Sequence, residues 1–351
     1  MKAFVCEKYG PPGVLQLREL PTPVPRANEV LIRVRAATVT SGDRRVRAFD
    51  LPAGMRSVGR LFLGWHGPRK PVLGTELAGD VTAVGKDVSR FSVGDRVFAF
   101  PGAGMGAYAE YRCMPEAGAV AAIPEGLSYE EAATLSFGGA TALDFFRKAG
   151  LRAGEKVLII GASGGVGSAA VQLARHLGAR VTGVCSGANR ELVRSLGADS
   201  VIDYTRQNPG VGGDRYDVIM DTVGTTQAGA GATPRGGTKP PQDLLELLNP
   251  GGRLLLVAAG LAEMLRLPVA ARWRGKRVIA GPADERPEYL HQLADLVRAG
   301  AYTVFIDRRY RFEDIAKAHG YVDTGRKRGN VVLLVDTAAS TSAHDGVLPA
   351  T

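Results

Sequence analysis

A glycine-rich turn near the middle of the chain constrains the fold more than any other feature. An unbroken aliphatic run at residues 157–160 precedes the turn, and apolar residues at helical spacing follow it over 169–177. The run predicts a strand buried on both faces, and the spacing after it predicts a helix. Glycines let a ligand approach the main chain closely, and a helix start offers unpaired N–H groups to a phosphate. The stretch therefore predicts a phosphate cradle for a dinucleotide, the alternative being a plain strand-to-helix packing turn.

Length and composition agree with a two-domain enzyme. The chain has 351 residues, of which 45% are hydrophobic and 23% charged, values typical of globular enzymes. No apolar run is long enough to span a membrane, and the first residues read as a strand and not as a signal peptide, so we expect a cytoplasmic protein without an integral membrane segment. Cys6, Cys113 and Cys185 lie far apart, which favours packing roles over a disulfide framework.

The net charge of +9 requires a separate interpretation. Such a charge is compatible with nucleic acid, a membrane surface or anionic ligands. The arginines are scattered along the chain and do not alternate with aromatic residues as a base-stacking surface would require. We therefore expect no nucleic-acid partner, and we expect the charge to serve a solvated surface and an anionic cofactor.

The order of segments predicts two architectures in one chain. Up to about residue 125 short alternating segments punctuated by Gly and Pro predict a small β-rich domain, with strands at 29–37, 77–85 and 95–100. Ser128, with Glu131 three residues later, predicts a helix start. Beyond it, strands alternate with helices, which predicts a parallel, doubly wound sheet. These later strand candidates are 156–160, 180–185, 200–202, 217–220, 253–258 and 277–280, with a helix at 286–298.

Several segments are expected to lie outside the parallel sheet. Residues 302–307 and 330–336 return to strand character, and the Gly-, Ala- and Pro-rich stretch 228–241 predicts a loop insertion. Residues 59–71 are expected to form a loop, in which Phe62, Trp65 and His66 either line an apolar substrate pocket or only pack. The small, polar residues after 336 predict a disordered tail.

The end of the second strand of the parallel sheet bears on the choice of cofactor. In a dinucleotide site this position meets the adenosine ribose, where a carboxylate would bind two free hydroxyls. No carboxylate follows Cys185 directly, whereas Ser186 can donate a hydrogen bond and Arg190 can supply charge to a 2′-phosphate. The sequence therefore favours NADPH over NADH. Tyr204 either adds a hydroxyl to the same phosphate or is a half-buried tyrosine at a strand end.

A set of motifs, in this order and spacing, resembles the medium-chain dehydrogenase/reductases, and among them the zinc-independent quinone oxidoreductase branch. The resemblance covers nearly the whole chain. It rests on the segments 72–79 (VLGTELAG), 106–111 (GAYAEY), 140–142 (ATA), 162–167 (ASGGVG), 196–199 (LGAD), 221–224 (DTVG) and 248–252 (LNPGG).

The resemblance implies an α/β architecture of two domains. Residues 1–126 and 300–340 would form a GroES-like, β-rich catalytic domain around an inserted Rossmann domain at 127–299, followed by a disordered tail at 341–351. The nicotinamide would lie in the cleft between the domains, usually in a homodimer. We expect NADPH to be bound by Thr141, Ser163, Gly164, Gly165, Val166, Ser186, Arg190, Tyr204, Val223 and Asn330.

The positions of zinc ligands are filled differently here. Zinc-dependent relatives would place a Cys near residues 41–43 and a His between Gly74 and Glu76, where this chain has Thr75, and the chain has no four-cysteine lobe. Hydroxyls and carboxylates make poor tetrahedral zinc sites without Cys or His. We therefore expect no metal and no alcohol oxidation through a zinc alkoxide.

The chemistry that remains is hydride delivery to an electron-poor acceptor, a quinone or a conjugated enone. Relatives often show an Asn-Pro-x-Asp pattern where this chain has Thr40 and Ser41, and a tyrosine where it has Arg45. These three residues are the catalytic candidates, as donors to the developing oxyanion, although a dedicated proton donor is not identifiable. Asp43 either belongs to this group or caps a short helix that follows.

Two other functions stay open. An enoyl-thioester reductase would need a basic patch for its acyl carrier, which these residues can provide: Arg44, Arg45, Arg47, Arg56, Arg60, Arg69 and Lys70. A non-enzymatic regulator would bind NADPH and turn over no acceptor.

Overall fold

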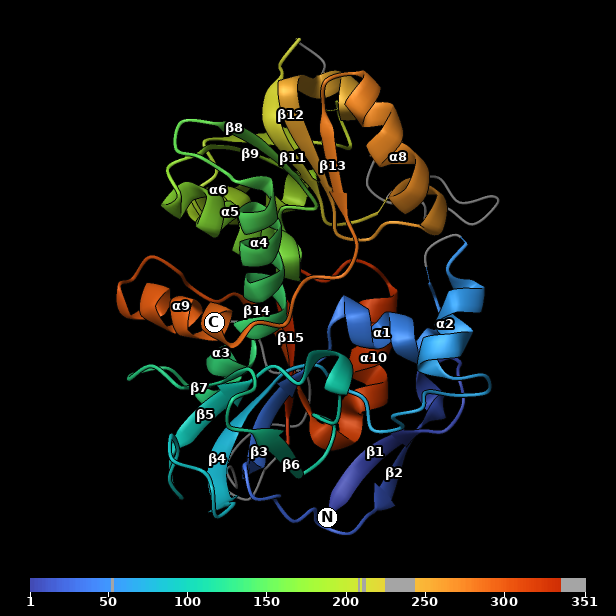
Figure 1. Cartoon of the computed structure of the whole chain (residues 1–351), viewed down its shortest axis with the longest axis vertical. Coiled ribbons are helices and arrows are strands. Elements are labelled where there is room, and N and C mark those ends of the chain that lie inside the picture. The colour runs from blue at the N-terminus through green and yellow to red at the C-terminus, as the bar shows by residue number, and fades with distance from the viewer. Residues whose placement is uncertain (52–53, 208, 210–212, 225–243, 336–351) are drawn as a thin grey trace.

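The computed structural model describes residues 1–51, 54–207, 209, 213–224 and 244–335. A parallel sheet occupies the upper half of the molecule in Figure 1, and a mainly antiparallel sheet occupies the lower half. The expected insertion at 228–241 and the expected tail at 341–351 lie outside the described residues. In the part of the chain that is described, no helix has the length and apolar character needed to cross a membrane.

The upper sheet has six strands, and every neighbouring pair is parallel. The strands lie in the order β10-β9-β8-β11-β12-β13. From β8 the chain first adds β9 and β10 on one side and then returns to add β11, β12 and β13 on the other. Doubly wound folds bind ligands at this switch point between β8 and β11. The strands are β8 (Lys156–Ile160), β9 (Arg180–Cys185), β10 (Ser200–Asp203), β11 (Tyr216–Asp221), β12 (Leu248–Leu256) and β13 (Arg277–Ala280). The described helices of this half include α4 (Ser136–Ala149), α5 (Gly165–His176), α6 (Arg190–Ser195) and α8 (Leu261–Trp273). The predicted doubly wound sheet is confirmed.

The lower sheet is built from both ends of the chain. Its strands run in the order β14-β15-β3-β4-β5-β7, with β6 paired to β3, so that the C-terminal β15 lies antiparallel to the N-terminal β3. The strands are β3 (Glu29–Thr38), β4 (Leu77–Val84), β5 (Arg96–Ala99), β6 (Tyr111–Pro115), β7 (Val120–Ala122), β14 (Ile306–Arg311) and β15 (Asn330–Leu334), and β1 (Lys2–Cys6) and β2 (Leu15–Glu19) form a separate pair. This confirms the GroES-like prediction, whereas the domain boundaries at 126/127 and 299/300 stay predictions.

The remaining helices lie around and between the sheets. They are α1 (Ser41–Ala48), α2 (Arg56–Leu63), α3 (Tyr129–Ala133), α9 (Pro287–Arg298) and α10 (Ile315–Asp323), with 3-10 turns at Pro12–Val14, Gly102–Gly104, Gly187–Asn189, Leu245–Leu247 and Phe312–Asp314. The predicted helix start at Ser128 is confirmed, because its side chain accepts from the Glu131 N–H and the Glu131 carboxylate accepts from the Ser128 N–H.

Two sequence predictions in this half are wrong. A loop is expected at 59–71, but residues 59–63 belong to α2. Gly59 is not a loop glycine, because it lies in the helix and packs closely: a Cβ there would lie 2.0 Å from Cδ1 of Leu51. The strand predicted at 302–307 starts only at Ile306. Before it, the main chain of Thr303 pairs with a side chain instead of a strand, since its N–H donates to Gln172 Oε1 at 2.8 Å and its carbonyl accepts from Gln172 Nε2 at 2.9 Å.

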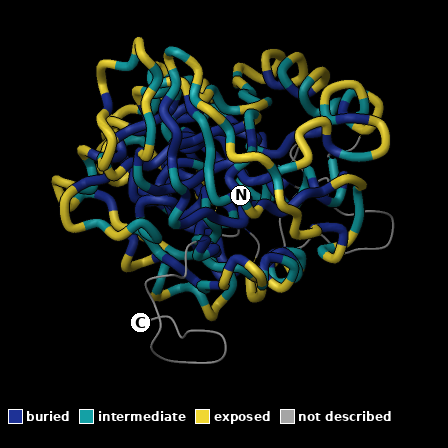
Figure 2. Tube along the Cα trace, turned by 90° about the horizontal axis from the view of Figure 1, so that it is seen from below, coloured by how far each residue is buried: buried dark blue, intermediate teal, exposed yellow. Residues whose placement is uncertain are grey.

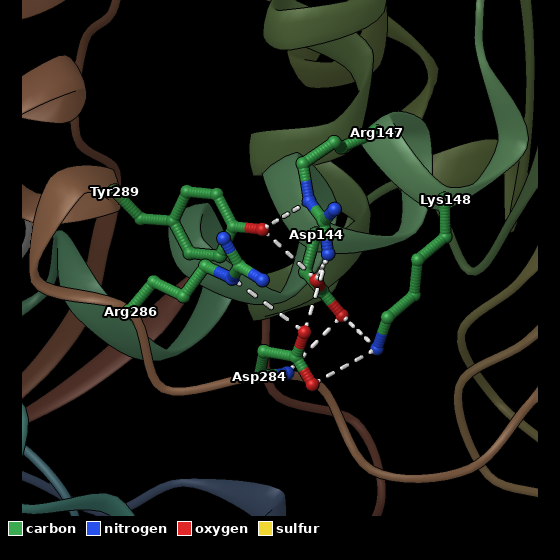
Figure 3. A network of polar contacts seen from close by, with 6 residues as sticks. All are labelled: Asp144, Arg147, Lys148, Asp284, Arg286 and Tyr289. Carbon is green, nitrogen blue, oxygen red and sulfur yellow. Dashed lines mark hydrogen bonds and ion pairs between the residues drawn. The ribbon is translucent and has the colours of Figure 1, made fainter.

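An ion-pair network fixes the segment that leaves the parallel sheet after β13 (Figure 3). The fully buried Asp144 of α4 accepts from Lys148 Nζ at 2.6 Å and from the Tyr289 hydroxyl at 2.9 Å, and Asp284 joins both Lys148 and Arg147. Burial alone would raise the pKa of Asp144, but these donors hold it below its usual value. Through Tyr289 the network ties α9 to α4. The apolar core also continues from the upper sheet into the lower one, because Phe98 of β5 and Phe145 of α4 belong to one cluster. Figure 2 shows this buried interior surrounded by exposed loops.

Candidate functional site

The turn from β8 into α5 is closed around its glycines. A Cβ on Gly167 would lie 2.0 Å from the Gly161 carbonyl oxygen, and Gly161 itself has a φ of 78°. Gly164 precedes α5 without any side-chain cap, so the first N–H groups of the helix receive no capping side chain. The predicted strand-to-helix turn is therefore present and contains Ser163, Gly164, Gly165 and Val166, whereas their binding of a phosphate stays a prediction.

The C-terminal segment crosses this cradle. The Gly329 N–H donates to the Ser163 carbonyl oxygen at 2.7 Å. Asn330 Oδ1 and Lys327 Nζ lie 3.3 and 3.2 Å from the point that a Cβ on Gly165 would occupy. The structure thus brings Asn330 to the cradle, as expected, and adds Lys327. Sequence reasoning missed that lysine, whose signal was a basic run, Arg326 to Arg328, just before Asn330.

At the expected adenosine end of the site, Asn189, which sequence reasoning missed, lies beside the predicted residues Ser163, Ser186 and Arg190. Asn189 Nδ2 donates to Ser163 Oγ at 3.1 Å and to Ser186 Oγ at 3.2 Å, so it joins the phosphate turn to the end of β9. Arg190 begins α6, and its buried Nε has no hydrogen-bond partner among the described residues. A buried guanidinium nitrogen without a partner fits an anion that is supplied by a ligand.

A carboxylate does reach this end of the site, which the sequence did not reveal. Asp203, at the end of β10, lies so close to Gly187 that a Cβ there would stand 2.6 Å from Asp203 Oδ2. Its oxygens are already bound, since Oδ1 accepts from the Thr205 hydroxyl at 2.7 Å and Oδ2 lies 3.7 Å from Arg206 Nε. These bonds hold the pKa of Asp203 below its usual value. The residues directly after Cys185 contain no carboxylate, as the sequence indicates, but the prediction did not consider Asp203 on the neighbouring strand β10.

The other predicted cofactor residues differ in how free they are. Val223 lies against the glycine turn, with Cγ2 only 2.6 Å from the Cβ position of Gly161. The Thr141 hydroxyl donates to the Phe137 carbonyl oxygen at 2.6 Å within α4. Tyr204 is half-buried against an apolar cluster of the parallel sheet, which matches the packing alternative for this residue. The roles of all three stay predictions.

The catalytic candidates lie at the start of α1, where a capping box holds two of the side chains together. Thr40 Oγ donates to Asp43 Oδ2 at 2.6 Å and accepts from the Asp43 N–H, while the Thr40 N–H donates to the same Oδ2 at 2.8 Å. Thr75 Oγ stands 3.4 Å from both Thr40 Oγ and Asp43 Oδ2. Burial raises the pKa of Asp43 to about 6, against the hydrogen bonds from Thr40 and Thr75. Thr40 is therefore the N-cap of α1, and Asp43 completes the capping box from the third position inside the helix, whereas the sequence placed Asp43 before a helix; Ser41 is the half-buried first residue.

Arg45, on the same helix, interacts electrostatically with the end of the parallel sheet. It is half-buried, and burial lowers its pKa, whereas the charges of Asp50 and Asp221 act in the opposite direction. Asp221 ends β11, is fully buried and has an Oδ2 without a hydrogen-bond partner among the described residues. Arg45 thus joins the GroES-like half electrostatically to the carboxyl end of the parallel sheet.

The residues at the positions of zinc ligands in relatives form a hydroxyl-rich cluster. Glu76, next to Thr75, is fully buried and accepts from the Thr38 hydroxyl at 2.5 Å and from the Phe137 N–H at 2.6 Å. Burial raises the pKa of Glu76 to about 7, against these two hydrogen bonds. Across the described residues, no group of three or more His, Cys, Asp or Glu side chains is arranged to hold a metal ion.

Comparisons with known proteins agree with this geometry. Residues 26–125 match the family model described as the alcohol dehydrogenase GroES-like domain, and residues 196–333 match the one described as zinc-binding dehydrogenase. The chain is 33% identical to NAD(P)H oxidoreductase RTN4IP1, mitochondrial, of Mus musculus, covering 95% of this chain and 89% of that protein. It is 30% identical to 2-methylene-furan-3-one reductase of Solanum lycopersicum, covering 95% and 79%.

A solved structure extends the likeness to the whole fold. The quinone oxidoreductase from Coxiella burnetii superposes with a TM-score of 0.82 at 29% identity, covering 96% of this chain and 99% of that one. The matches to these relatives extend over both halves of the molecule. The chain therefore belongs to the medium-chain dehydrogenase/reductase family, in its quinone oxidoreductase-like branch.

Proposed function

We propose that this protein is an NADPH-dependent reductase that delivers hydride to a quinone or a conjugated enone without a metal ion. The observation that carries the proposal is the open, uncapped start of α5, crossed by Asn330 and flanked by Ser186 and Arg190 at the adenosine end. When bound there, NADPH supplies the hydride from C4 of its nicotinamide. The relatives named above as a quinone oxidoreductase and a furanone reductase support this class of acceptor.

The preference for NADPH rests on charge at the adenosine end. Arg190 has a buried Nε without a partner among the described residues, and Asn189 holds Ser186 Oγ in place beside the cradle. Two carboxylates lie near this end: the exposed Glu191, which follows Arg190 in α6, and Asp203, whose Oδ1 accepts from the Thr205 hydroxyl and whose Oδ2 forms an ion pair with Arg206. A 2′-phosphate would therefore meet an arginine and a hydroxyl, with the Asp203 carboxylate already engaged.

Arg45 is proposed as the main group that stabilises charge developing on the acceptor oxygen. An arginine guanidinium stays protonated even when it is buried, and Arg45 lies near enough to Asp221, at the sheet end where the cofactor is expected, to interact with its charge. Thr40 and Ser41 would contribute from the same helix. Because the Thr40 hydroxyl already donates to Asp43, it would have to change its partner to act on a substrate.

We propose a homodimer in the cytoplasm as the assembly and location. β13 is an edge strand of the described parallel sheet. The main-chain groups of an edge strand can pair with the same strand of a second subunit. Its pairing would extend the sheet across two subunits.

A second candidate function is supported by a surface groove. The groove has a volume of about 330 Å³ and is lined by Phe49, Arg56, Ser57, Arg60 and Trp65. The Arg60 guanidinium lies 4.7 Å from the Phe49 ring centre, and no carboxylate of the described residues pairs with Arg56 or Arg60. Cationic and aromatic groups together suit the phosphate-bearing carrier of an acyl thioester, so an enoyl-thioester reductase is the alternative.

Turnover of three acceptors separates these functions. NADPH oxidation is followed at 340 nm with a benzoquinone, a conjugated enone and crotonyl-CoA, each repeated with NADH. We expect turnover of the quinone or the enone, with kcat/KM about tenfold or more higher for NADPH than for NADH, because the 2′-phosphate adds charge-assisted hydrogen bonds.

The other outcomes identify the alternatives. Turnover of crotonyl-CoA alone, reduced by a combined Arg56→Gln and Arg60→Gln variant, would replace the proposal with the thioester reductase. Tight NADPH binding without turnover of any acceptor would indicate the non-enzymatic regulator.

A further inference from the structure

Lys327 occupies an unusual position for a lysine, at the electropositive end of a helix. Its Nζ lies 3.2 Å from the Cβ position of Gly165, the first residue of α5, and donates to the Gly329 carbonyl oxygen at 2.7 Å. Helix N-termini carry a partial positive charge and unpaired N–H groups. An ammonium group beside them is repelled unless an anion lies between the two.

Within the described part of the chain, no acidic side chain neutralises Lys327 at close range. Among the described residues, no carboxylate oxygen lies within ion-pair distance of Lys327 Nζ, although Glu76, Asp307 and Asp43 act on it from farther away. Burial lowers the pKa of Lys327 to about 8, against the influence of these three carboxylates. Lys148 shows the contrasting case in the same protein, since it pairs with Asp144 at 2.6 Å.

From this juxtaposition we infer that Lys327 binds the diphosphate of a nicotinamide dinucleotide, together with the free N–H groups at the start of α5. The inference rests on the proposed function, which puts such a cofactor on this cradle. Because the diphosphate is common to NADPH and NADH, Lys327 strengthens the binding of both, whereas Arg190 distinguishes them. The glycine pattern points to the cradle, and the lysine reaches it from the far end of the chain.

Two ligand fragments isolate this contact. ADP-ribose carries the diphosphate without a 2′-phosphate, and adenosine 2′-monophosphate carries the 2′-phosphate without a diphosphate. By calorimetry, Lys327→Gln is expected to weaken ADP-ribose binding about 10- to 100-fold, the range for hydrogen bonds to charged groups, and to change adenosine 2′-monophosphate binding less than about twofold. Arg326→Gln, which removes the same charge from an exposed neighbour, should change neither.

The pH dependence of binding gives a second readout. The pKa of Lys327 is about 8, so its ammonium is lost as pH rises from about 7 to 9.5, and ADP-ribose binding by the wild type should weaken over that range. Glu76 and Asp43, with pKa values of about 7 and 6, are largely ionised through most of this interval, and Asp307 is held by Arg328. Lys327→Arg keeps its charge, so its affinity should stay nearly constant with pH.

Three results would overturn the inference. If Lys327→Gln binds ADP-ribose as tightly as the wild type does, Lys327 does not contact the diphosphate. The same conclusion follows if Lys327→Arg shows the same loss of ADP-ribose affinity with rising pH as the wild type. Equal loss for both fragments, with a lowered melting temperature, shows that the lysine only supports the Gly329 main chain. If the wild type itself binds neither fragment nor NADPH, the proposed cofactor site fails together with the inference, which distinguishes that outcome from the first three.

Discussion

Replacing Gly167 with alanine is expected to lower the free energy of unfolding by about 3 kcal/mol or more and to abolish NADPH binding. The added Cβ would lie 2.0 Å from the Gly161 carbonyl oxygen and 2.8 Å from the Ala162 Cα. Both are backbone atoms of the turn itself, so no side-chain movement can relieve the overlap. α5 would have to move away from β8, and the cradle would open. Urea denaturation measures the loss of stability, and fluorescence titration measures the loss of binding.

Gly164→Ala is the matched control for this prediction. The nearest atom to its Cβ would be the Gly161 carbonyl oxygen at 3.4 Å, an ordinary contact distance, and the residue has a φ of −82° that alanine adopts readily. Its stability should stay within about 0.5 kcal/mol of the wild type. Native stability in Gly167→Ala would contradict the close packing of β8 against α5.

Replacing Arg190 with glutamate is expected to weaken NADPH binding about 100-fold or more and NADH binding less than about threefold. The variant exchanges a charge-assisted hydrogen bond to the 2′-phosphate for repulsion between two anions in a partly buried site. NADH lacks the phosphate and would lose only minor contacts. Titration of nicotinamide fluorescence gives both dissociation constants.

Arg194 on the same helix offers a control, because it is exposed and lies about one turn beyond Arg190. Arg194→Glu makes the same change of net charge and should leave the ratio of the two affinities unaltered. An equal loss of NADPH and NADH binding in Arg190→Glu would take Arg190 out of the phosphate site.

The parallel sheet was predictable because its signal is local. β9 (Arg180–Cys185) and β13 (Arg277–Ala280) have the predicted limits. β9 is largely buried, as its apolar run predicts, whereas β13 is an edge strand of half-buried residues that a short apolar run still reveals. The errors arose where a tertiary contact overrode the local pattern. Thr303 pairs with the Gln172 side chain instead of a strand, and Gly59 permits close packing inside a helix.

The site shows the same division. The phosphate turn is contiguous in sequence, so its glycines could be recognised, whereas Lys327 and Asp203 reach it from other segments. The basic run around Lys327 is visible in the sequence, but nothing local connects it with the turn. Asn189 followed Ser186 closely but was not considered. Thr40 was predicted as a substrate donor, and the structure shows it in a capping box, which the pattern Thr40-x-x-Asp43 could have revealed.

The measurement that tests the central claim most directly is deuterium transfer by the metal-free protein. The chain is treated with EDTA, its metal content is checked by mass spectrometry, and it is incubated with a conjugated enone and NADPH that carries deuterium at both positions of C4. We predict that the reduced product carries deuterium at its β-carbon, and that added zinc does not raise the rate. Product formation that requires zinc, or a product without deuterium, would contradict metal-free hydride transfer from NADPH.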